Sequence, residues 1–417
     1  MIRTVHKSVI QGSVSAPPSK SMTQRAIAAA LLSEGTTVIK NPSRCNDSLA
    51  AMGMAGALGA VIESGEDFIE LTGTVKSPRG ITLNCGESGL AMRLFSPLAA
   101  LLSGNCILSG EGSLRKRPVT MITDALSRLG VVAKSDNGFL PLTIEGFLKG
   151  GDIEIDGSSG SQMLTGLLMA LPVVPADSVV TVSNLKSKPY IDLTLQILDD
   201  FGIKIENKDY KRFFIQGNQL YKAHTYSVEG DWSGAAFMLV AGTIAGEVTV
   251  NNLMAVSLQA DVAVLEALKR AGAKIISDNN AVKAVKSTLK AFDFDATESP
   301  DLFPPLACLA INCSGTSRIK GVTRLEHKES DRGLTILSVL NGLGIKATIS
   351  DDSMLVEGGE VKGASVSSHN DHRIAMMAAV AALRGDGPVT VTEAEAVSKS
   401  YPEFFSDLKK IGADIRY

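Results

Sequence analysis

The feature that most constrains the fold of this 417-residue chain is a unit repeated six times along it. Near the end of each copy, an apolar helical pattern stops at a glycine that is followed by a β-prone residue. These glycines are 68 to 72 residues apart: Gly59, Gly130, Gly202, Gly272, Gly344 and Gly412. Such regular spacing indicates one supersecondary unit in six copies that pack on one another.

The order of predicted elements is the same in every copy. A strand is followed by a helix, a second strand, a second helix and two short strands, which is the pattern βαβαββ. The first strands of the six copies are GSVSAP, GITLNC, GDIEID, TYSVEG, FDFDAT and ASVSSH. The pattern therefore predicts an α/β protein built from six βαβαββ repeats.

The two ends of the chain indicate how the copies are grouped. The sixth copy stops at Tyr417 before its last strand, and about Arg3 to Ile10 form a strand that has no copy of its own. We expect this N-terminal strand to complete the sixth copy. Two lobes of three repeats follow: residues 19–229, and residues 1–18 together with 230–417.

The start of the first helix has the composition of an anion site. Two prolines oppose helix, and Ser19 or Ser21 can then cap a helix that continues through an apolar stretch. Lys20 lies at its N-terminus, where free N–H groups and the helix dipole attract anions, and Arg25 lies one turn after Ser21. The alternative interpretation is a capped surface helix with solvated charges.

Three repeats around a pseudo-threefold axis would bring three such helix starts together in each lobe. Two carboxylates, Asp301 and Glu329, also lie at predicted helix starts, and a carboxylate among cations stays ionised and can accept a proton. The alternatives are an N-terminal cap for Asp301 and a surface salt-bridge helix for Glu329. The other residues at helix starts are mostly cations or hydrogen-bond donors: Lys20, Arg25, Gly89, Arg115, Lys116, Arg117, Ser161, Gln162, Ser187, Lys188, Lys328, Arg332, Arg373 and Lys399.

Composition excludes several classes of protein. The net charge of −3 argues against a dedicated nucleic-acid binder, and the five cysteines form no CxxC motif, which favours free thiols in a reducing compartment. The apolar runs are too short to span a membrane, and the first residues lack the apolar segment of a signal peptide. His369 and His372 have no cysteine or histidine cluster around them. We expect a soluble, cytoplasmic protein without a metal site.

A series of stretches occurs in order, from about Gly12 to the C-terminus: PSKSMTQRA, GESGLAMR, RKRP, GSSGSQMLTGLL, SKPYID, VEGD, HKESDR, NDHRIAM and SKSYPEFF. They resemble the family of 5-enolpyruvylshikimate-3-phosphate (EPSP) synthases. The resemblance implies two lobes forming an inside-out α/β barrel, the enolpyruvyl transferase fold. It also implies transfer of the enolpyruvyl group of phosphoenolpyruvate to the 5-hydroxyl of shikimate 3-phosphate, through a tetrahedral intermediate and with release of phosphate.

The resemblance further implies a step of aromatic amino-acid synthesis that needs no metal or organic cofactor. The partners would be small-molecule substrates, with no nucleic acid and no membrane, and we expect a monomer. Because both substrates are anions, the lobes are expected to close when shikimate 3-phosphate binds.

Roles for residues at matching positions also follow from the resemblance. Asp301 would be the base for the 5-hydroxyl proton, and Glu329 and Lys20 would carry the proton at C3. The residues implied to bind shikimate 3-phosphate are Lys20, Ser21, Arg25, Ser161, Gln162, Ser187, Asp301 and Lys328. Those implied to bind phosphoenolpyruvate are Lys20, Gly89, Arg117, Gln162, Arg332, Arg373 and Lys399.

Some positions depart from the common family pattern. Gly160 stands where a phosphate-binding serine is usual, so its N–H or Ser159 would have to substitute, and Arg324 stands where an asparagine is common. The stretch ESGLAMRL also differs from the usual one, at Glu87, Leu90 and Leu94, although Gly89 is kept. We therefore expect the family inhibitor glyphosate to bind with altered strength.

Two other functions fit parts of the sequence. The sister transferase that acts on UDP-N-acetylglucosamine carries a cysteine in the loop that matches Glu111 to Arg117, where this chain has EGSLRKR. A non-catalytic phosphate- or RNA-binding repeat protein would need the cations but neither Asp301 nor Glu329.

Overall fold

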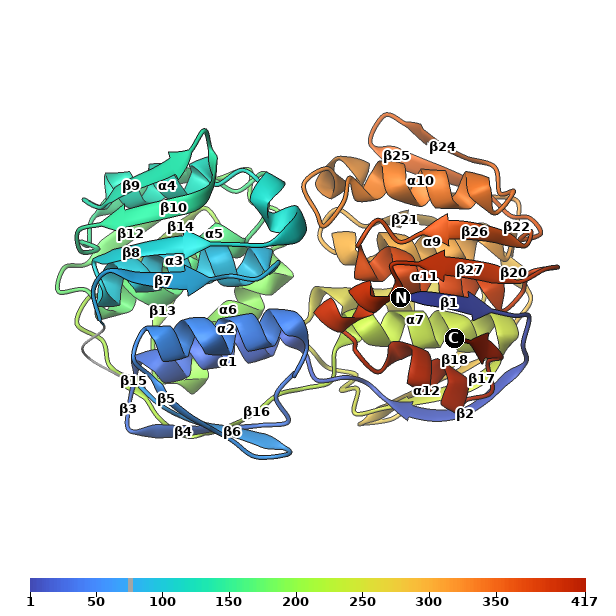
Figure 1. Ribbon diagram of the computed structural model, residues 1–417, viewed down its shortest axis with the longest axis horizontal. Helices are drawn as coiled ribbons and strands as arrows, with labels where there is room; N and C mark the ends of the chain where they lie inside the picture. The colour runs from blue at the N-terminus through green and yellow to red at the C-terminus, as the bar shows by residue number, and fades with distance from the viewer. Residues whose placement is uncertain (74–77) are drawn as a thin grey trace. The chain divides into compact units, whose positions relative to one another are not determined.

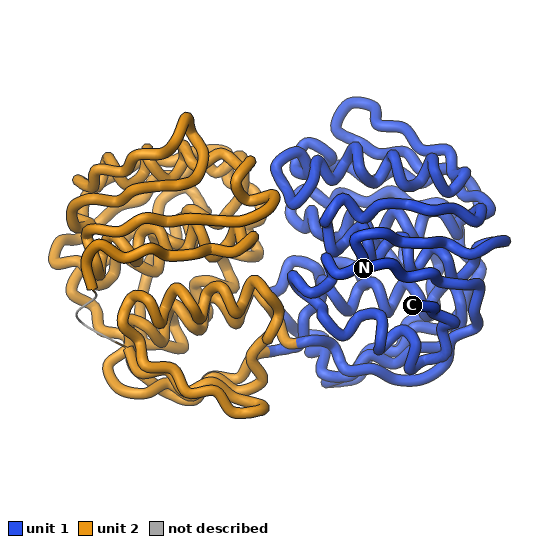
Figure 2. Tube along the Cα trace, in the orientation of Figure 1, with its two compact units in different colours: residues 1–17, 229–417 blue, residues 18–228 orange. Residues whose placement is uncertain are grey.

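The computed structural model describes residues 1–73 and 78–417 and consists of two compact units (Figure 2). Unit 1 comprises Met1–Pro17 and Glu229–Tyr417, and unit 2 comprises Pro18–Val228. The chain thus passes between the units twice, and each unit has its own buried apolar core. The predicted lobe boundaries lie one residue from these.

Within the described residues, each unit contains three four-stranded sheets of the same topology. In every sheet the first strand of a repeat pairs in parallel with the second, and the last strand runs antiparallel between the second and the third. Unit 2 has the sheets β16-β4-β6-β5, β7-β8-β10-β9 and β11-β12-β14-β13, and unit 1 has β2-β17-β19-β18, β21-β23-β25-β24 and β26-β27-β1-β28. The α/β class and the βαβαββ repeat are therefore confirmed.

The strands of these sheets are short. In unit 2 their bounds are β4 (Thr36–Lys40), β5 (Val61–Ser64), β6 (Phe68–Thr72), β7 (Ile81–Asn84), β8 (Asn105–Ser109), β9 (Val132–Asp136), β10 (Phe139–Glu145), β11 (Asp152–Asp156), β12 (Ser178–Ser183), β13 (Ile205–Lys208), β14 (Arg212–Ile215) and β16 (Thr225–Ser227). In unit 1 they are β1 (Ile2–Val5), β2 (Ile10–Ser15), β17 (Gly246–Asn251), β18 (Lys274–Ser277), β19 (Ala281–Val285), β21 (Asp293–Asp295), β23 (Thr316–Lys320), β24 (Ala347–Ser350), β25 (Ser353–Glu357), β26 (Ala364–Ser367), β27 (Val389–Thr392) and β28 (Ile415–Arg416). Two further pairs are β3 (Ser33–Glu34) with β15 (Tyr221–Lys222), and β20 (Leu289–Lys290) with β22 (Cys313–Ser314).

The first helix of each repeat lies at the centre of its unit (Figure 1). In unit 2 these helices are α1 (Lys20–Leu32), α3 (Gly89–Leu102) and α5 (Gln162–Ala170), and in unit 1 they are α7 (Trp232–Ala245), α9 (Phe303–Ile311) and α11 (His372–Ala382). Every residue of α3 from Gly89 to Ala100 is buried, as expected of a helix that is apolar on all sides. The central helices contact one another, so their N-termini can meet within each unit.

The second helix of each repeat buries one face only. In α4 (Thr120–Arg128), for example, Ile122, Ala125 and Leu126 are buried. The others are α2 (Asn46–Ala57), α6 (Pro189–Asp200), α8 (Val264–Arg270), α10 (Arg332–Gly342) and α12 (Phe404–Lys410). Short 3₁₀ segments are η1 (Gly112–Lys116), η2 (Leu171–Val173), η3 (Ala260–Ala263), η4 (Pro300–Leu302), η5 (Val322–Leu325) and η6 (Ala394–Lys399). Across the described ranges, no helix is both long and apolar enough to cross a bilayer.

The six glycines that reveal the repeat share one conformation. Each has a positive φ, between +78° and +109°, directly after the second helix of its repeat. The N–H of the next residue then donates to the carbonyl five residues back, as from Ile203 to Leu198 and from Ala273 to Leu268. This is the Schellman ending of a helix, and it requires the left-handed conformation that glycine adopts without steric cost. The repeat is thus visible in the sequence because the turn geometry demands glycine.

The structure corrects the assignment of two first strands. The sequence pattern places GSVSAP in the first repeat and TYSVEG in the fourth. Instead, β2 pairs in parallel with β17 of the fourth repeat, and β16 pairs in parallel with β4 of the first repeat. The two segments occupy equivalent places in equivalent repeats, so only tertiary pairing decides which sheet each one joins.

The N-terminal strand is also shorter than predicted. β1 covers Ile2–Val5, whereas Ile10 already belongs to β2. β1 lies between β27 and β28, antiparallel to both, and so occupies the last-strand position of the sixth sheet.

Candidate active site

The start of α1 carries a lysine that is paired with a carboxylate. Ser19, rather than Ser21, is the N-cap residue, and its side chain accepts from the N–H of Met22 at 3.5 Å. Lys20 Nζ lies 3.0 Å from Asp47 Oδ2, and the two side chains are only 14% and 9% exposed. Asp47 is in the first turn of α2 and was not among the predicted site residues.

Among the described residues, Arg25 is a buried cation that has only neutral hydrogen-bond partners. Its guanidinium donates to Thr194 Oγ1 and to the carbonyl of Ser21, both at 2.9 Å, and more weakly to Thr165 Oγ1 and the carbonyl of Tyr190. Burial lowers the pKa of Arg25 to about 10. A buried charge without a counter-charge is costly, so an anion bound beside Arg25 would lower this cost.

Within the part of the chain that the structure describes, a second buried cation without an acidic partner lies at the start of α3. Arg93 is buried, and its Nη1 donates to Gln162 Oε1 at 3.0 Å and to the carbonyl of Gly89 at 3.2 Å. Burial, together with the charge of Arg117, lowers the pKa of Arg93 to about 10. A Cβ on Gly89 would lie only 2.6 Å from Nη1 of Arg117, so the close approach of the guanidinium requires glycine here. Sequence reasoning missed Arg93, although it lies one helical turn after Gly89.

The two serines predicted to hold a phosphate lie in adjacent loops. Ser161 is the residue before α5 and Ser187 precedes α6, and they are only 3% and 5% exposed. The N–H of Lys186 donates to the carbonyl of Gly157, which ties the two loops together. The N–H of Gly160 also donates to Gly157, at 3.0 Å, so it is already used within its own turn.

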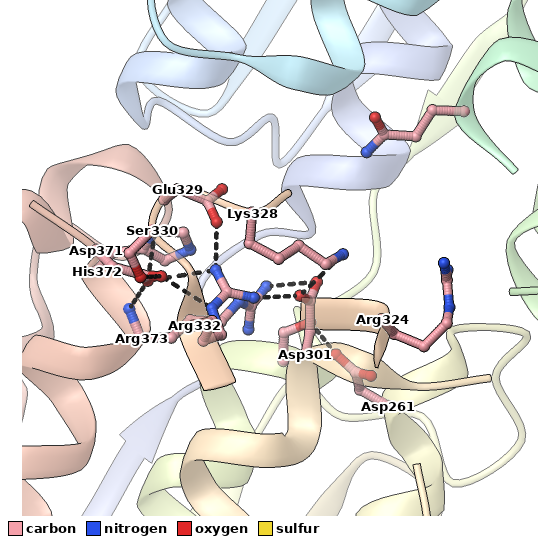
Figure 3. Close-up of polar contacts among 12 residues, drawn as sticks. Asp261, Asp301, Arg324, Lys328, Glu329, Ser330, Arg332, Asp371, His372 and Arg373 are labelled. Atoms are coloured by element: carbon pink, nitrogen blue, oxygen red, sulfur yellow. Dashed lines mark hydrogen bonds and ion pairs between the residues drawn. The ribbon is translucent and has the colours of Figure 1, made fainter. Parts of the chain in front are cut away.

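In unit 1, Arg332 joins three carboxylates (Figure 3). Its side chain is fully buried at the first position of α10. It donates to Asp371 Oδ2 at 2.9 Å, to Asp301 Oδ1 at 2.8 Å and to Glu329 Oε2. The residues come from three segments of the chain, and a single guanidinium holds them together.

Asp301 receives three cations. Besides Arg332, Arg373 Nη2 donates to its other oxygen at 2.9 Å, and Lys328 Nζ lies 3.9 Å away. Burial alone would raise the pKa of Asp301, but these cations hold it well below its usual range. Burial lowers the pKa of Lys328 to about 8, against the attraction of Asp301. Asp301 is therefore ionised at neutral pH and able to accept a proton.

The N-terminus of α11 contributes a carboxylate that sequence reasoning missed. Asp371 is fully buried, caps α11 through the N–H of Arg373, and accepts from Arg332. Among the described residues, Glu329, Asp371 and His372 are one group with ligand atoms close enough for a metal ion. Because Arg332 donates to both carboxylates, its guanidinium already supplies the positive charge there.

A further buried carboxyl lies beside Asp301 (Figure 3). Asp261 is 1% exposed, accepts from Ser233 on α7 through Oδ2, and has no hydrogen-bond partner at Oδ1 among the described residues. Burial raises the pKa of Asp261 to about 7, with Asp301 and Asp231 acting in the same direction and Arg373 against them. It thus carries a proton more readily than an ordinary aspartate.

Two other cations, Lys399 and Arg324, lie near the cluster around Arg332 and Asp301. Lys399, at the end of η6, is 5% exposed and donates to the carbonyl of Asn370 at 2.7 Å. Arg324 in η5 donates weakly to the carbonyl of Thr297, and burial lowers its pKa. The negative charges of Glu298 and Asp301 act on this pKa in the opposite direction.

The predicted site residues therefore form two sets, one in each unit. The set in unit 2 combines hydrogen-bond donors with excess positive charge: Lys20, Ser21, Arg25, Gly89, Arg117, Ser161, Gln162 and Ser187. The set in unit 1 combines proton acceptors with cations: Asp301, Lys328, Glu329, Arg332, Arg373 and Lys399.

Comparison with known sequences points to one family. The family model for EPSP synthase (3-phosphoshikimate 1-carboxyvinyltransferase) matches residues 5–408. Relatives named 3-phosphoshikimate 1-carboxyvinyltransferase include one from Methanocella arvoryzae, 40% identical over all of both chains, and one from Methanocorpusculum labreanum, 38% identical over 99% of each. A third, from Clostridium acetobutylicum, is 39% identical over 97% of this chain and 96% of its own.

Solved structures agree with the sequence comparison. EPSP synthase from Acinetobacter baumannii superposes with a TM-score of 0.84 at 26% identity, and the match covers all of both chains. The enolpyruvyl transferase NikO from Streptomyces tendae gives a TM-score of 0.77 at 19% identity, covering 100% of this chain and 98% of its own, which shows the shared fold. The fold implied by the resemblance is confirmed.

Proposed function

This chain belongs to the EPSP synthase family, and from that premise we propose which of its residues bind each substrate and which transfer protons. The enzyme transfers the enolpyruvyl group of phosphoenolpyruvate to the 5-hydroxyl of shikimate 3-phosphate and releases phosphate, in aromatic amino-acid biosynthesis. Because both substrates are anions, catalysis requires fixed positive charge as well as groups that carry protons.

Shikimate 3-phosphate binds mainly to unit 2. Arg25 takes its carboxylate, and Ser161 and Ser187 take its 3-phosphate, with help from Lys20 and Ser21. The single observation that carries this assignment is the buried guanidinium of Arg25, whose partners are all neutral oxygens. An incoming carboxylate would supply the missing counter-charge through bidentate hydrogen bonds. Gln162 bridges the two substrates, and Lys328 reaches shikimate 3-phosphate from unit 1.

Phosphoenolpyruvate binds to a second group of cations and hydrogen-bond donors. The assigned residues are Lys20, Gly89, Arg117, Gln162, Arg332, Arg373 and Lys399. The closeness of Gly89 to Arg117, and the uncompensated charge of Arg93 beside them, support an anion at this place. Arginine suits both the carboxylate and the phosphate because its fork of donors matches two oxygens.

Asp301 is the base of the addition step. It takes the proton of the 5-hydroxyl as that oxygen forms a bond to C2 of phosphoenolpyruvate, while Lys20 or Glu329 gives a proton to C3. The tetrahedral intermediate then loses phosphate from C2, and the same groups take a proton back from C3. Asp301 starts this sequence ionised, because three cations lower its pKa.

Substrate binding adjusts the strength of this base. In the free enzyme Arg332 and Arg373 both donate to Asp301. Once the anionic phosphoenolpyruvate draws on the same guanidinium groups, the positive field on Asp301 weakens and its pKa rises toward that of an effective base. The ion pairs of the free enzyme therefore keep Asp301 ionised, and its pKa is no longer held so low once phosphoenolpyruvate has bound.

The variant Asp301→Asn tests this assignment. We expect a loss of turnover of about 10²–10⁴-fold, with the KM for shikimate 3-phosphate changed by less than about threefold, since the amide keeps the shape but cannot take the proton. Phosphate release from phosphoenolpyruvate, measured with and without shikimate 3-phosphate, is the assay. Asp295→Asn serves as the control, because Asp295 is a half-exposed carboxylate of unit 1 that pairs with Lys320. Wild-type turnover in Asp301→Asn would exclude Asp301 as the base.

We further propose that the enzyme works as a monomer in the cytoplasm and binds no nucleic acid. All five cysteines are buried and unpaired, which suits a reducing compartment. Light scattering coupled to size-exclusion chromatography tests the oligomeric state, and a dimeric mass at micromolar concentration would contradict it.

A further inference from the structure

The segment that leads into α3 is tied to the segment that carries Arg117. The N–H of Glu111 donates to the carbonyl of Gly86 at 2.7 Å, and the side-chain amide of Asn84 donates to Glu111 Oε1 at 2.7 Å. These contacts fasten the end of β7 to the residue just before η1. The body of η1, which lies nearer to Arg117, is anchored in the core of unit 2 by the fully buried Leu114.

Glu87 supplies a contact to η1 itself. Its Oε2 accepts from the backbone N–H of Ser113 at 2.9 Å and from the Ser113 hydroxyl at 3.2 Å. Hydrogen bonds to an ionised carboxylate are among the stronger ones in proteins. Gly112 has a φ of +47°, and a Cβ on it would overlap the carboxylate of Glu87. The carboxylate thus occupies the space that a side chain at position 112 would need.

The two residues joined by this contact lie close in sequence to the anion-binding groups. Glu87 is two residues before Gly89, and Ser113 is four residues before Arg117. The guanidinium groups of Arg93 and Arg117 both approach Gly89, at 3.0 and 2.6 Å from its missing Cβ, and they repel each other. Contacts that fix η1 therefore help to hold the loop of Arg117 against this repulsion.

We propose that Glu87 is a positioning residue, whose carboxylate holds η1 so that Arg117 stays beside Gly89 and Arg93, preorganised for phosphoenolpyruvate. This inference rests on the proposed function, which assigns phosphoenolpyruvate to Gly89 and Arg117. Glu87 acts through Arg117 and does not itself touch the substrate. Preorganisation of this kind improves binding because the loop need not be ordered when the ligand arrives.

The variants Glu87→Ala and Glu87→Gln separate positioning from charge. If Glu87 positions η1, Glu87→Ala raises the KM for phosphoenolpyruvate about tenfold, while kcat and the KM for shikimate 3-phosphate stay within about twofold. Glu87→Gln stays near wild type, because its amide oxygen still accepts from Ser113. If Glu87 acted only through its negative charge, both variants would bind phosphoenolpyruvate more tightly. That result, or equal effects of the two variants, would overturn the proposal.

Three further variants extend this comparison. Glu145→Ala removes a negative charge from an exposed position at the end of β10, so it should leave the KM for phosphoenolpyruvate unchanged. Ser113→Ala removes only the hydroxyl donor and should raise this KM by about two- to threefold, which gives a readout if Glu87→Ala folds poorly. The double variant Glu87→Ala/Ser113→Ala should be no worse than Glu87→Ala, because both remove the same contact.

Arg117→Ala distinguishes failure of this inference from failure of the proposed function. If Arg117→Ala leaves the KM for phosphoenolpyruvate unchanged, the assignment of that substrate to Arg117 is wrong. If Arg117→Ala raises it but Glu87→Ala does not, the substrate assignment stands and the positioning role of Glu87 is wrong.

Discussion

At the scale of single residues, the most informative group is the buried guanidinium of Arg25. The two hydroxyl groups that accept from Arg25 keep other hydrogen bonds without it. Thr194 Oγ1 also donates to the carbonyl of Tyr190 at 2.7 Å and lies 3.1 Å from Thr165 Oγ1. Replacing a buried, uncompensated charge with an apolar side chain of similar length is commonly neutral or stabilising. We therefore propose that Arg25 serves ligand binding rather than the stability of the fold.

We predict that Arg25→Met separates binding from stability. The KM for shikimate 3-phosphate should rise by about a hundredfold or more, since a buried charge pair contributes about 2–5 kcal/mol to binding. The free energy of unfolding without ligand should stay equal or increase, as measured by urea denaturation. Arg128→Met on the exposed face of α4 is the control for loss of an arginine and should change neither value. A clear loss of stability in Arg25→Met would contradict this account.

Asp261 leads to a prediction about pH at the same scale. Its pKa in the folded protein is about 7, above the ordinary value of 3.8, so the folded state holds a proton that the unfolded state has lost. Stability from this group is therefore full below about pH 4 and is lost as pH rises toward 7. Asp261→Asn should gain stability relative to wild type between about pH 5 and pH 8, as judged from melting temperatures in matched buffers. Parallel pH curves for the two proteins would show that Asp261 does not titrate in this range.

At the scale of elements, the repeat depends on how its second helices end. Gly202 follows α6 with a φ of +83°, and a Cβ there would meet mainly the flexible side chain of Lys222. Gly53 lies at an exposed position inside α2, in the same unit, and a Cβ added there would meet nothing within 4 Å. The two glycines thus differ in backbone conformation much more than in available space.

We predict opposite effects of alanine at these two glycines. Gly202→Ala should lower the free energy of unfolding by about 1 kcal/mol, because an alanine in the left-handed conformation is strained. Gly53→Ala should raise the free energy of unfolding by about 0.5–1 kcal/mol, because alanine forms helix more readily than glycine. Urea unfolding of the full chain without ligand measures both changes in stability. Equal changes in the unfolding free energy of the two variants would mean that the left-handed helix ending does not require glycine.

At the scale of the whole molecule, each unit contains one sheet whose first strand is distant in sequence from the other three strands. β2 lies in a sheet of unit 1 just before the chain enters unit 2, and β16 lies in a sheet of unit 2 just before the chain returns. Only four residues separate β2 from α1, and four separate β16 from α7. Each connection between the units is therefore short and is anchored by a strand on one side and a helix on the other.

We predict that shikimate 3-phosphate changes the arrangement of the units. Anions bound among the site cations would remove the repulsion between them, and the scattering-derived radius of gyration should fall when the substrate is added. Arg25→Met should not respond at the same concentration, whereas Asp301→Asn should respond as wild type does. Identical scattering profiles with and without substrate would rule out closure.

The local pattern of the sequence determined the repeat and the helix starts. Landmark glycines are visible because a left-handed turn selects glycine, and Lys20, Arg25 and Asp301 stand out because helix starts favour particular residue types. Even the family resemblance depends on such short stretches. These features belong to a few consecutive residues, so they can be found without coordinates.

The tertiary structure alone decided which residues meet. Arg332 and Asp371 are 39 residues apart, Arg93 and Gln162 are 69 apart, and β2 joins a sheet whose other strands begin at Gly246. Asp47, Arg93, Asp261 and Asp371 therefore escaped sequence reasoning, although each contacts or perturbs a predicted site residue. Burial and pairing depend on the packing of distant repeats, and equivalent repeats offer equivalent partners. Choosing among such partners is a property of the packed molecule, which no single stretch of the chain contains.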